Sequence, residues 1–163
     1  MTFINAITLS NQTLQYPAVG IPTPEEEALA WLIEQDPAHL NVSMGAERIR
    51  QRYALLTLWF HQPSSTQIKL FDWLSIDECK WELGADPCTA SGVVDGIDLR
   101  RDNLQGRIPD DLGLLTELTF LFLAENALTG TIPSLLGQLT ALQELSLYTN
   151  ALNGTIPDDL GLL

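Results

Sequence analysis

The sequence predicts an α/β repeat fold, a solenoid of three 24-residue coils behind a helical N-terminal cap. The stretch NALTGTIPSLLGQL, residues 126–139, recurs 24 residues later as NALNGTIPDDLGLL and 24 residues earlier as DNLQGRIPDDLGLL. Upstream, TPEEEALAWLIEQDP has the residue order of a capped amphipathic helix. One repeat unit cannot bury its apolar face alone, so the three copies are expected to stack.

The three copies share one apolar skeleton. Aligned on their glycines, they form the columns Val94, Leu118 and Leu142; Ile97, Leu121 and Leu145; Leu99, Leu123 and Leu147; Ile108, Ile132 and Ile156; and Leu112, Leu136 and Leu160. Each coil starts with a short strand, whose alternate residues share a face. The columns therefore predict a short parallel β-sheet on the concave side, with the leucines turned inward.

One polar position interrupts the skeleton in each coil, where the strand ends. Asn126 and Asn150 occupy it in the later copies, and a buried amide there can donate to and accept from backbone groups of adjacent coils. An asparagine ladder is the prediction. Asp102 takes the position in the first copy, and a carboxylate only accepts, so the ladder is expected to be incomplete there.

A glycine and an Ile-Pro pair follow in every copy. Gly106, Gly130 and Gly154 fit positions where φ is positive or backbones crowd, and each Ile-Pro pair predicts an extended segment on the far side. The whole pattern, LxxLxLxxNxLxGxIPxxLGxL, resembles the plant-type leucine-rich repeat family. The resemblance makes residues 94–163 three such repeats, and because the text stops in mid-repeat we expect a solenoid truncated at its C-terminus.

Residues 23–93 are expected to cap the first coil, after an N-terminal extension at 1–22 that is expected to be flexible. A first helix should have Thr23 as N-cap, Pro24 at its first position and Glu26 in a capping box, and should stop at residues 36–37. A second helix is predicted over 46–61. It should present one apolar face, with Arg48 and Arg52 elsewhere; that face consists of Ile49, Tyr53, Leu56 and Phe60.

Two tryptophans and two cysteines lie between the helices and the coils. Trp73, Cys79, Trp81 and Cys88 resemble the N-terminal cap of plant-type repeats, which implies a Cys79–Cys88 disulfide, although the spacing departs from the usual CxWxGVxC form. The helices and this cap together look similar to leucine-rich repeat proteins of diatoms. A pair of buried thiols is the alternative. No metal site is expected, because His39 and His61 have no ligand spacing to the cysteines.

Charge and hydropathy exclude several classes of function. The formal net charge of -13 repels phosphate backbones and anionic lipids, so nucleic acid is not an expected partner. The longest apolar stretch, 54–60, is far shorter than the roughly 20 residues of a membrane span. The first 22 residues lack the features of a secretory signal.

Catalysis is not expected, because the sequence has no nucleophile motif, phosphate loop or metal cluster, and no cofactor is implied. The acidic runs 25–27, 110–111 and 158–159 are explained by a helix N-terminus and by a solvated convex side. Three sequons, at Asn11, Asn41 and Asn153, would accept glycans on the secretory route.

The concave surface is the remaining candidate site. The strand period turns four columns outward: Gly96, Phe120 and Glu144; Asp98, Phe122 and Ser146; Arg100, Ala124 and Tyr148; and Arg101, Glu125 and Thr149. Large apolar groups turned toward solvent favour a contact surface, and a neighbouring element or subunit that covers Phe120 and Phe122 is the alternative. The expected ligand-binding residues are Phe120, Phe122, Tyr148, Asp98, Arg100, Glu144 and Ser146.

Three functions compete on these grounds. The leading hypothesis is a non-catalytic recognition module, extracellular, at the cell surface or lumenal, that binds a protein, peptide or glycan as part of a receptor-like or secreted protein. A structural scaffold within a larger complex is the second. An inhibitor of secreted hydrolases is the third, on the resemblance to plant-type repeats alone.

Overall fold

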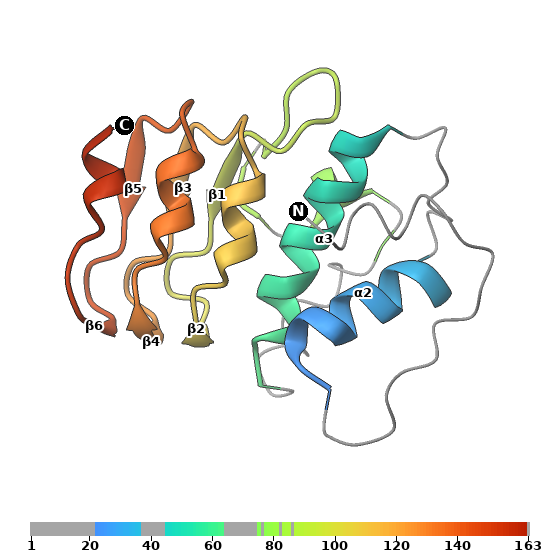
Figure 1. Ribbon diagram of the computed structural model, residues 1–163. Helices are drawn as coiled ribbons and strands as arrows, with labels where there is room; N and C mark the ends of the chain where they lie inside the picture. Colours follow the sequence, from blue (N-terminus) through green and yellow to red (C-terminus); the bar gives the residue numbers. More distant parts are fainter. Residues whose placement is uncertain are drawn as a thin grey trace.

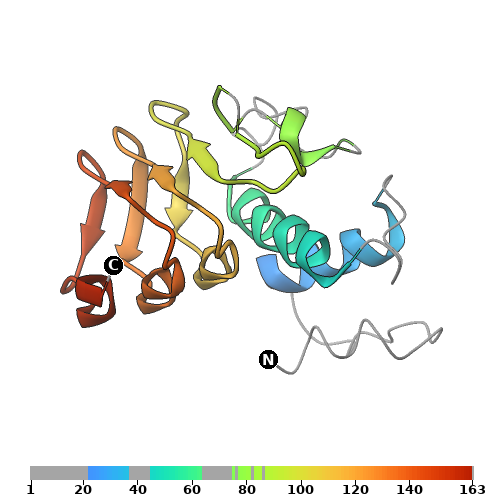
Figure 2. The ribbon, with the colours of Figure 1, turned by 90° about the horizontal axis from the view of Figure 1, so that it is seen from above.

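The computed structural model describes residues 22–36, 45–63, 75, 77–81, 83–85 and 87–162. Two helices lie at one end, and three coils stack beside them along the chain (Figures 1 and 2). Almost all of the expected extension, together with Trp73 and His39, lies outside the described residues.

Helix α2 spans Pro24–Glu34 and begins where the capping pattern predicts. The Thr23 hydroxyl accepts from the backbone N–H of Glu26 at 3.3 Å, and the Glu26 carboxylate accepts from the backbone N–H of Thr23 at 2.9 Å. This capping box satisfies two N–H groups that a helix start leaves unpaired. Ala28 and Leu32 are buried and hold α2 against the second helix.

Helix α3 spans Ala46–Phe60, close to its predicted bounds, but its buried surface is broader than the predicted stripe. Of the four predicted residues only Leu56 is fully buried, whereas Leu55 and Leu58 on other faces have no exposed surface. The reason is that α3 packs against α2 on one side and against the first coil on another. Arg52, expected outside the apolar face, is also fully buried.

Each coil contains two short strands and a 3-10 helix (Figure 1). The concave sheet is parallel and consists of β1 (Gly96–Asp98), β3 (Phe120–Phe122) and β5 (Glu144–Ser146). A second parallel sheet, not predicted as strands, consists of β2 (Gln105–Arg107), β4 (Ala127–Thr131) and β6 (Ala151–Asn153). The coils are completed by η4 (Asp110–Leu114), η5 (Ser134–Gln138) and η6 (Asp158–Leu162).

The register of the concave sheet is the one that the columns predict. Ile97 pairs with Leu121, and Leu121 pairs with Leu145. Gly106, at the centre of β2, has φ +73, and its counterparts in the next coils have φ +79. The prolines lie beyond the ends of the second-sheet strands, where no ladder hydrogen bond is lost.

The core runs through the interior of the coils and continues under α3. Leu118, Leu121 and Leu123 have no exposed surface. Because each coil covers the apolar face of its neighbour, burial falls along the isoleucine column, from 3% exposed at Ile108 to 75% exposed at Ile156.

The residues before β1 occupy the free edges of both sheets. On the concave side, the N–H of Asp98 donates to the carbonyl of Leu83 at 2.6 Å, and that of Gly96 donates to the carbonyl of Pro87 at 3.3 Å. On the second sheet, the N–H of Gln105 donates to the Gln62 side chain at 2.8 Å. Edge groups that would otherwise be unpaired are thus satisfied from outside the coils.

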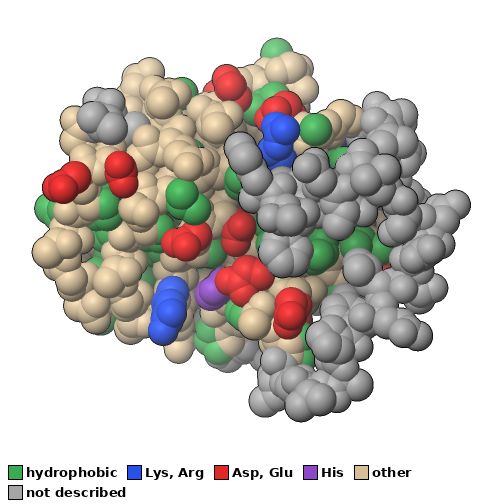
Figure 3. Space-filling model, viewed as in Figure 1, with side chains coloured by type: hydrophobic (Ala, Val, Ile, Leu, Met, Phe, Trp, Pro, Cys, Tyr) green, Lys and Arg blue, Asp and Glu red, His purple; other side chains and the backbone are tan. Residues whose placement is uncertain are grey.

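Acidic side chains gather where the helices meet the first coil, on the face shown in Figure 3. Asp110 is exposed as expected, but Asp111 is half-buried, and burial, with Glu25 and Asp110 nearby, raises the pKa of its carboxyl. His61 lies with Nε2 3.4 Å from Oε1 of Glu25. Burial raises the pKa of Tyr53 to about 12, and the nearby Asp111 and Glu25 add to the effect.

Candidate functional site

The concave sheet brings the predicted binding residues into adjacent positions. Strand pairing sets Phe120 beside Gly96 on one side and Glu144 on the other, and sets Phe122 between Asp98 and Ser146. Neighbouring strands lie about 4.8 Å apart, so these outward side chains form a continuous surface across the three coils.

The rings of Phe120 and Phe122 form a tilted aromatic pair, and both side chains are half-buried rather than fully exposed. The Phe120 ring lies over Gly96, so close that a Cβ built on that glycine would be 2.0 Å from Cζ of the ring. The ring centroids of Phe120 and Phe122 are 5.2 Å apart, within the usual range for aromatic pairs. The alternative interpretation was that a neighbouring element or subunit covers these two rings. Part of their burial comes instead from contacts within the concave sheet itself.

Arg100 and Asp98 form an ion pair over the second ring. The Arg100 guanidinium donates twice to the Asp98 carboxylate, at 2.7 and 2.5 Å, and lies 4.8 Å from the centroid of Phe122. These hydrogen bonds hold the pKa of the Asp98 carboxyl below its ordinary value and raise that of Arg100.

A second ion pair joins adjacent coils. Arg101 donates to the Glu125 carboxylate at 2.8 and 2.7 Å, and the hydroxyl of Tyr148 donates to the same carboxylate at 3.3 Å. Hydrogen bonding to Arg101 lowers the pKa of Glu125. Tyr148 is 59% exposed, the most exposed aromatic side chain among the described residues.

An open depression of about 450 Å³ lies among these charged groups. It is lined by Asp98, Arg100, Arg101, Asp102, Glu125 and Tyr148. Three of the expected ligand-binding residues line it, namely Asp98, Arg100 and Tyr148. The other four do not, and they lie on β3 and β5: Phe120, Phe122, Glu144 and Ser146. Arg101 and Glu125 were not among the expected set, although opposite charges 24 residues apart predict a contact between stacked coils.

Asparagine side chains bind the backbone at the end of each of the two later strands. The Asn126 amide donates to the carbonyl of Leu99 in the preceding coil at 2.7 Å and accepts from the N–H of Leu104 at 3.0 Å. Asn150 repeats both bonds one coil later, with Leu123 and Leu128. These side chains fix the chain just after the concave strands, which positions the outward residues.

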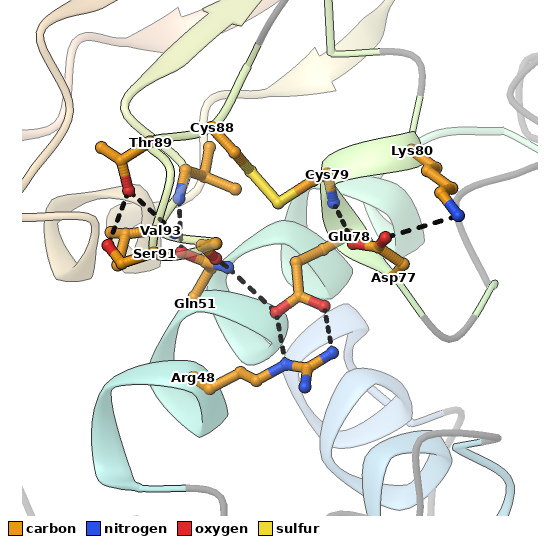
Figure 4. The surroundings of a disulfide bond; sticks show 12 residues. Arg48, Gln51, Asp77, Glu78, Cys79, Lys80, Cys88, Thr89, Ser91 and Val93 are labelled. Atoms are coloured by element: carbon orange, nitrogen blue, oxygen red, sulfur yellow. Dashed lines mark hydrogen bonds and ion pairs between the residues drawn. A yellow bond between two sulfur atoms is a disulfide. The ribbon is translucent and has the colours of Figure 1, made fainter.

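A disulfide joins Cys79 to Cys88, as the resemblance implied. Beneath it, Glu78 points toward helix α3 and accepts from Arg48 and Gln51 (Figure 4). The Gln51 side chain in turn accepts from the N–H of Val94, at the start of the first coil, at 2.7 Å.

Arg52 is the centre of a buried ionic network that the sequence did not reveal. Its guanidinium donates to both oxygens of Asp36, at 2.8 and 2.7 Å, and to Glu78 at 2.8 Å. It also lies 5.0 Å from the ring centroid of Trp81, which is 1% exposed. The network connects the end of α2, helix α3 and the disulfide loop.

Of the three expected glycosylation sites, the structure describes one. Asn153 is exposed on β6, whereas the sequons at Asn11 and Asn41 lie outside the described residues. Within the described ranges, no three His, Cys, Asp or Glu residues are arranged to hold a metal ion. None of the helices in that part of the chain has the length and apolar character needed to cross a membrane.

The family match to known proteins lies in the coils. Residues 117–139 and 141–163 match the family model described as Leucine Rich Repeat. The curated proteins include no significant match. Among solved structures, the BIR2 ectodomain from Arabidopsis thaliana is 30% identical, with 67% of this chain and 59% of that chain covered and a TM-score of 0.58.

Two further structures are similar over shorter or looser alignments. The LRR ectodomain of the plant receptor kinase GASSHO1/SCHENGEN3 from Arabidopsis thaliana, in complex with CASPARIAN STRIP INTEGRITY FACTOR 2, is 45% identical over 36% of this chain and 7% of that chain, with a TM-score of 0.35. The PEPR1–AtPEP1 structure is 27% identical over 67% and 19%, with a TM-score of 0.47. The chain thus spans less than two thirds of each of the three. Residues 117–163 are leucine-rich repeats, folded as part of a solenoid similar to a plant ectodomain.

Proposed function

We propose that this chain is a non-catalytic recognition module that binds a peptide or protein segment through its concave face. The observation that carries the proposal is the exposed ring of Tyr148 at the rim of a depression lined by charged side chains. An exposed aromatic side chain beside paired charges is typical of binding hot spots, because it buries a large area at a small cost in side-chain entropy.

An extracellular or lumenal location is part of the proposal. The Cys79–Cys88 disulfide supports it, because such bonds persist in oxidising compartments. The likeness to the BIR2 ectodomain supports it as well. The closer similarity to diatom proteins stays a prediction.

The test uses peptides selected from a random display library on the immobilised chain. Binding of the selected peptides should weaken at least tenfold on Tyr148→Ala, while the thermal unfolding midpoint stays within a few degrees because the ring is exposed. Gln138→Ala, an exposed change on η5 at the opposite side, is the matched control and should bind as the unchanged chain does.

Two results would contradict the proposal. One is a set of selected peptides whose affinity is the same for Tyr148→Ala and for Gln138→Ala. The other is association of the chain with itself in light scattering that Tyr148→Ala abolishes, which would favour the scaffold function instead.

A further inference from the structure

One triplet of the second sheet has side chains that the packing of the coils does not use. Asn153 ends β6, and Gly154 and Thr155 follow it. Asn153 and Thr155 are exposed, and within the described part of the chain neither side chain has a hydrogen-bond partner. The half-buried ladder asparagines differ, because Asn126 and Asn150 each donate to backbone carbonyls. The amide of Asn153 is therefore accessible from solvent.

The exposure of this triplet does not depend on its place in the third coil. Thr129 and Thr131 hold the equivalent positions in the second coil, which has a coil on each side, and both are exposed. Thr129 also donates to the carbonyl of Gly106 in the preceding coil at 3.0 Å, a contact that Asn153 does not repeat among the described residues. A large group attached to Asn153 would therefore meet solvent rather than a neighbouring coil.

The fold requires only the middle residue of the triplet. Gly154 has φ +79, as Gly130 does, and a Cβ built on Gly154 would be 2.9 Å from Cγ2 of Thr131. The flanking residues vary, since Gln105 and Arg107 flank the glycine in the first coil and two threonines flank it in the second. The order Asn-Gly-Thr is an acceptor for N-linked glycans and occurs in the third coil alone. It is therefore not a by-product of the repeat.

We infer that Asn153 is modified with an N-linked oligosaccharide. The inference rests on the extracellular or lumenal location in the proposed function. The transferase of the secretory route moves the oligosaccharide from a lipid diphosphate carrier to Nδ2 of Asn153. A bond forms between Nδ2 and C1 of the first sugar, the bond between C1 and the diphosphate oxygen breaks, and the nitrogen loses one proton. The glycan then lies on the second sheet, apart from the depression that Tyr148 lines.

The experiment expresses the whole chain in insect cells behind a cleavable secretory signal. Peptide N-glycosidase in heavy-oxygen water releases the glycan and labels the residue that carried it, and mass spectrometry of peptides locates the label. We expect the label at Asn153. Thr155→Ala should abolish it and Thr155→Ser should retain it, because the acceptor triplet needs the hydroxyl. Thr131→Ala, the same change at the equivalent exposed position one coil earlier, is the control and should leave the label in place.

Each outcome decides one of the two proposals. A label at Asn153 that Thr155→Ala removes supports the inference. An unlabelled Asn153 in a chain whose Cys79–Cys88 bond has formed overturns it, because that chain has passed through an oxidising compartment. Sensitivity of the selected peptides to Tyr148→Ala keeps the proposed function in that case.

The position of the glycan has its own test. Enzymatic removal of the glycan should leave the affinity for the selected peptides unchanged, because the sugar and Tyr148 belong to different sheets. A change of about tenfold or more would overturn the separation of the glycan from the recognition surface. Circular dichroism of each variant establishes that it is folded.

Discussion

At the scale of single residues, the ring of Phe120 occupies the space that a side chain on Gly96 would fill. The glycine leaves room for the ring to lie against the backbone of β1, and this contact holds Phe120 beside Phe122. The orientation of the aromatic pair therefore depends on a residue that has no side chain of its own.

Gly96→Ala should destabilise the fold by about 1 to 3 kcal/mol, because the new methyl group overlaps the Phe120 ring and forces it away. Chemical unfolding measures the loss. Gly161→Ala, where a Cβ would meet nothing within 4 Å, is the control and should change little. In a Phe120→Ala background the cost of Gly96→Ala should largely disappear; an undiminished cost there would show that the ring is not the cause.

At the scale of elements, helix α3 is joined to the rest of the cap by charge as much as by apolar packing. Arg52 and Glu78 are 0% and 1% exposed, and each has more than one charged partner. Bonding to Arg48 and Arg52 keeps the pKa of Glu78 below its ordinary value, although burial acts in the opposite direction. A buried network of this kind tolerates the loss of any member poorly.

Arg52→Met should destabilise the protein by about 3 to 5 kcal/mol, because Asp36 and Glu78 would be left as buried charges without their shared cation. Arg50→Met, on the same helix but in an exposed pair with Glu47, should change stability by about 0.5 kcal/mol or less. The comparison is made by urea unfolding at neutral pH. Similar midpoints for the two variants would contradict the importance of the network.

The elements also show why some features were predictable from sequence and others were not. The register of β1, β3 and β5 follows from a spacing of 24 residues, which alignment detects directly. The partners of Arg52 lie 16 and 26 residues away in non-repeating sequence, so no period marks them. The partial burial of Phe120 depends on its contact with one glycine in the preceding coil, which alternation along a strand does not predict.

At the scale of the whole molecule, the disulfide loop connects the helical part, α2 and α3, to the repeat coils that begin at β1. Glu78, next to Cys79, binds helix α3, while Pro87, next to Cys88, accepts hydrogen bonds from Asp95 and Gly96 at the edge of the concave sheet. The bond between the cysteines thus holds the helical part and the first coil together.

The double change Cys79→Ser and Cys88→Ser should lower stability by about 2 to 3 kcal/mol, through the greater freedom of the unfolded chain. A reducing agent should lower the unfolding midpoint of the unchanged protein toward that of the variant and leave the variant where it is. Amide hydrogen exchange at Gly96 and Asp98 should accelerate in the variant as well. Equal midpoints with and without reductant would contradict this account.

The joint between the helices and the first coil differs in kind from the joints between coils. Coil joins coil through a register that repeats, with each ladder asparagine bonding the same backbone groups of its neighbour. A duplication or loss of one 24-residue unit therefore recreates a compatible surface, and the length of the array is free to change in evolution. The first joint has no such freedom. The hydrogen bonds that Leu83, Pro87 and Gln62 accept from the backbone of the first coil are not part of the repeat. Variation in coil number is therefore expected downstream of β1, while the joint itself is inherited as one piece.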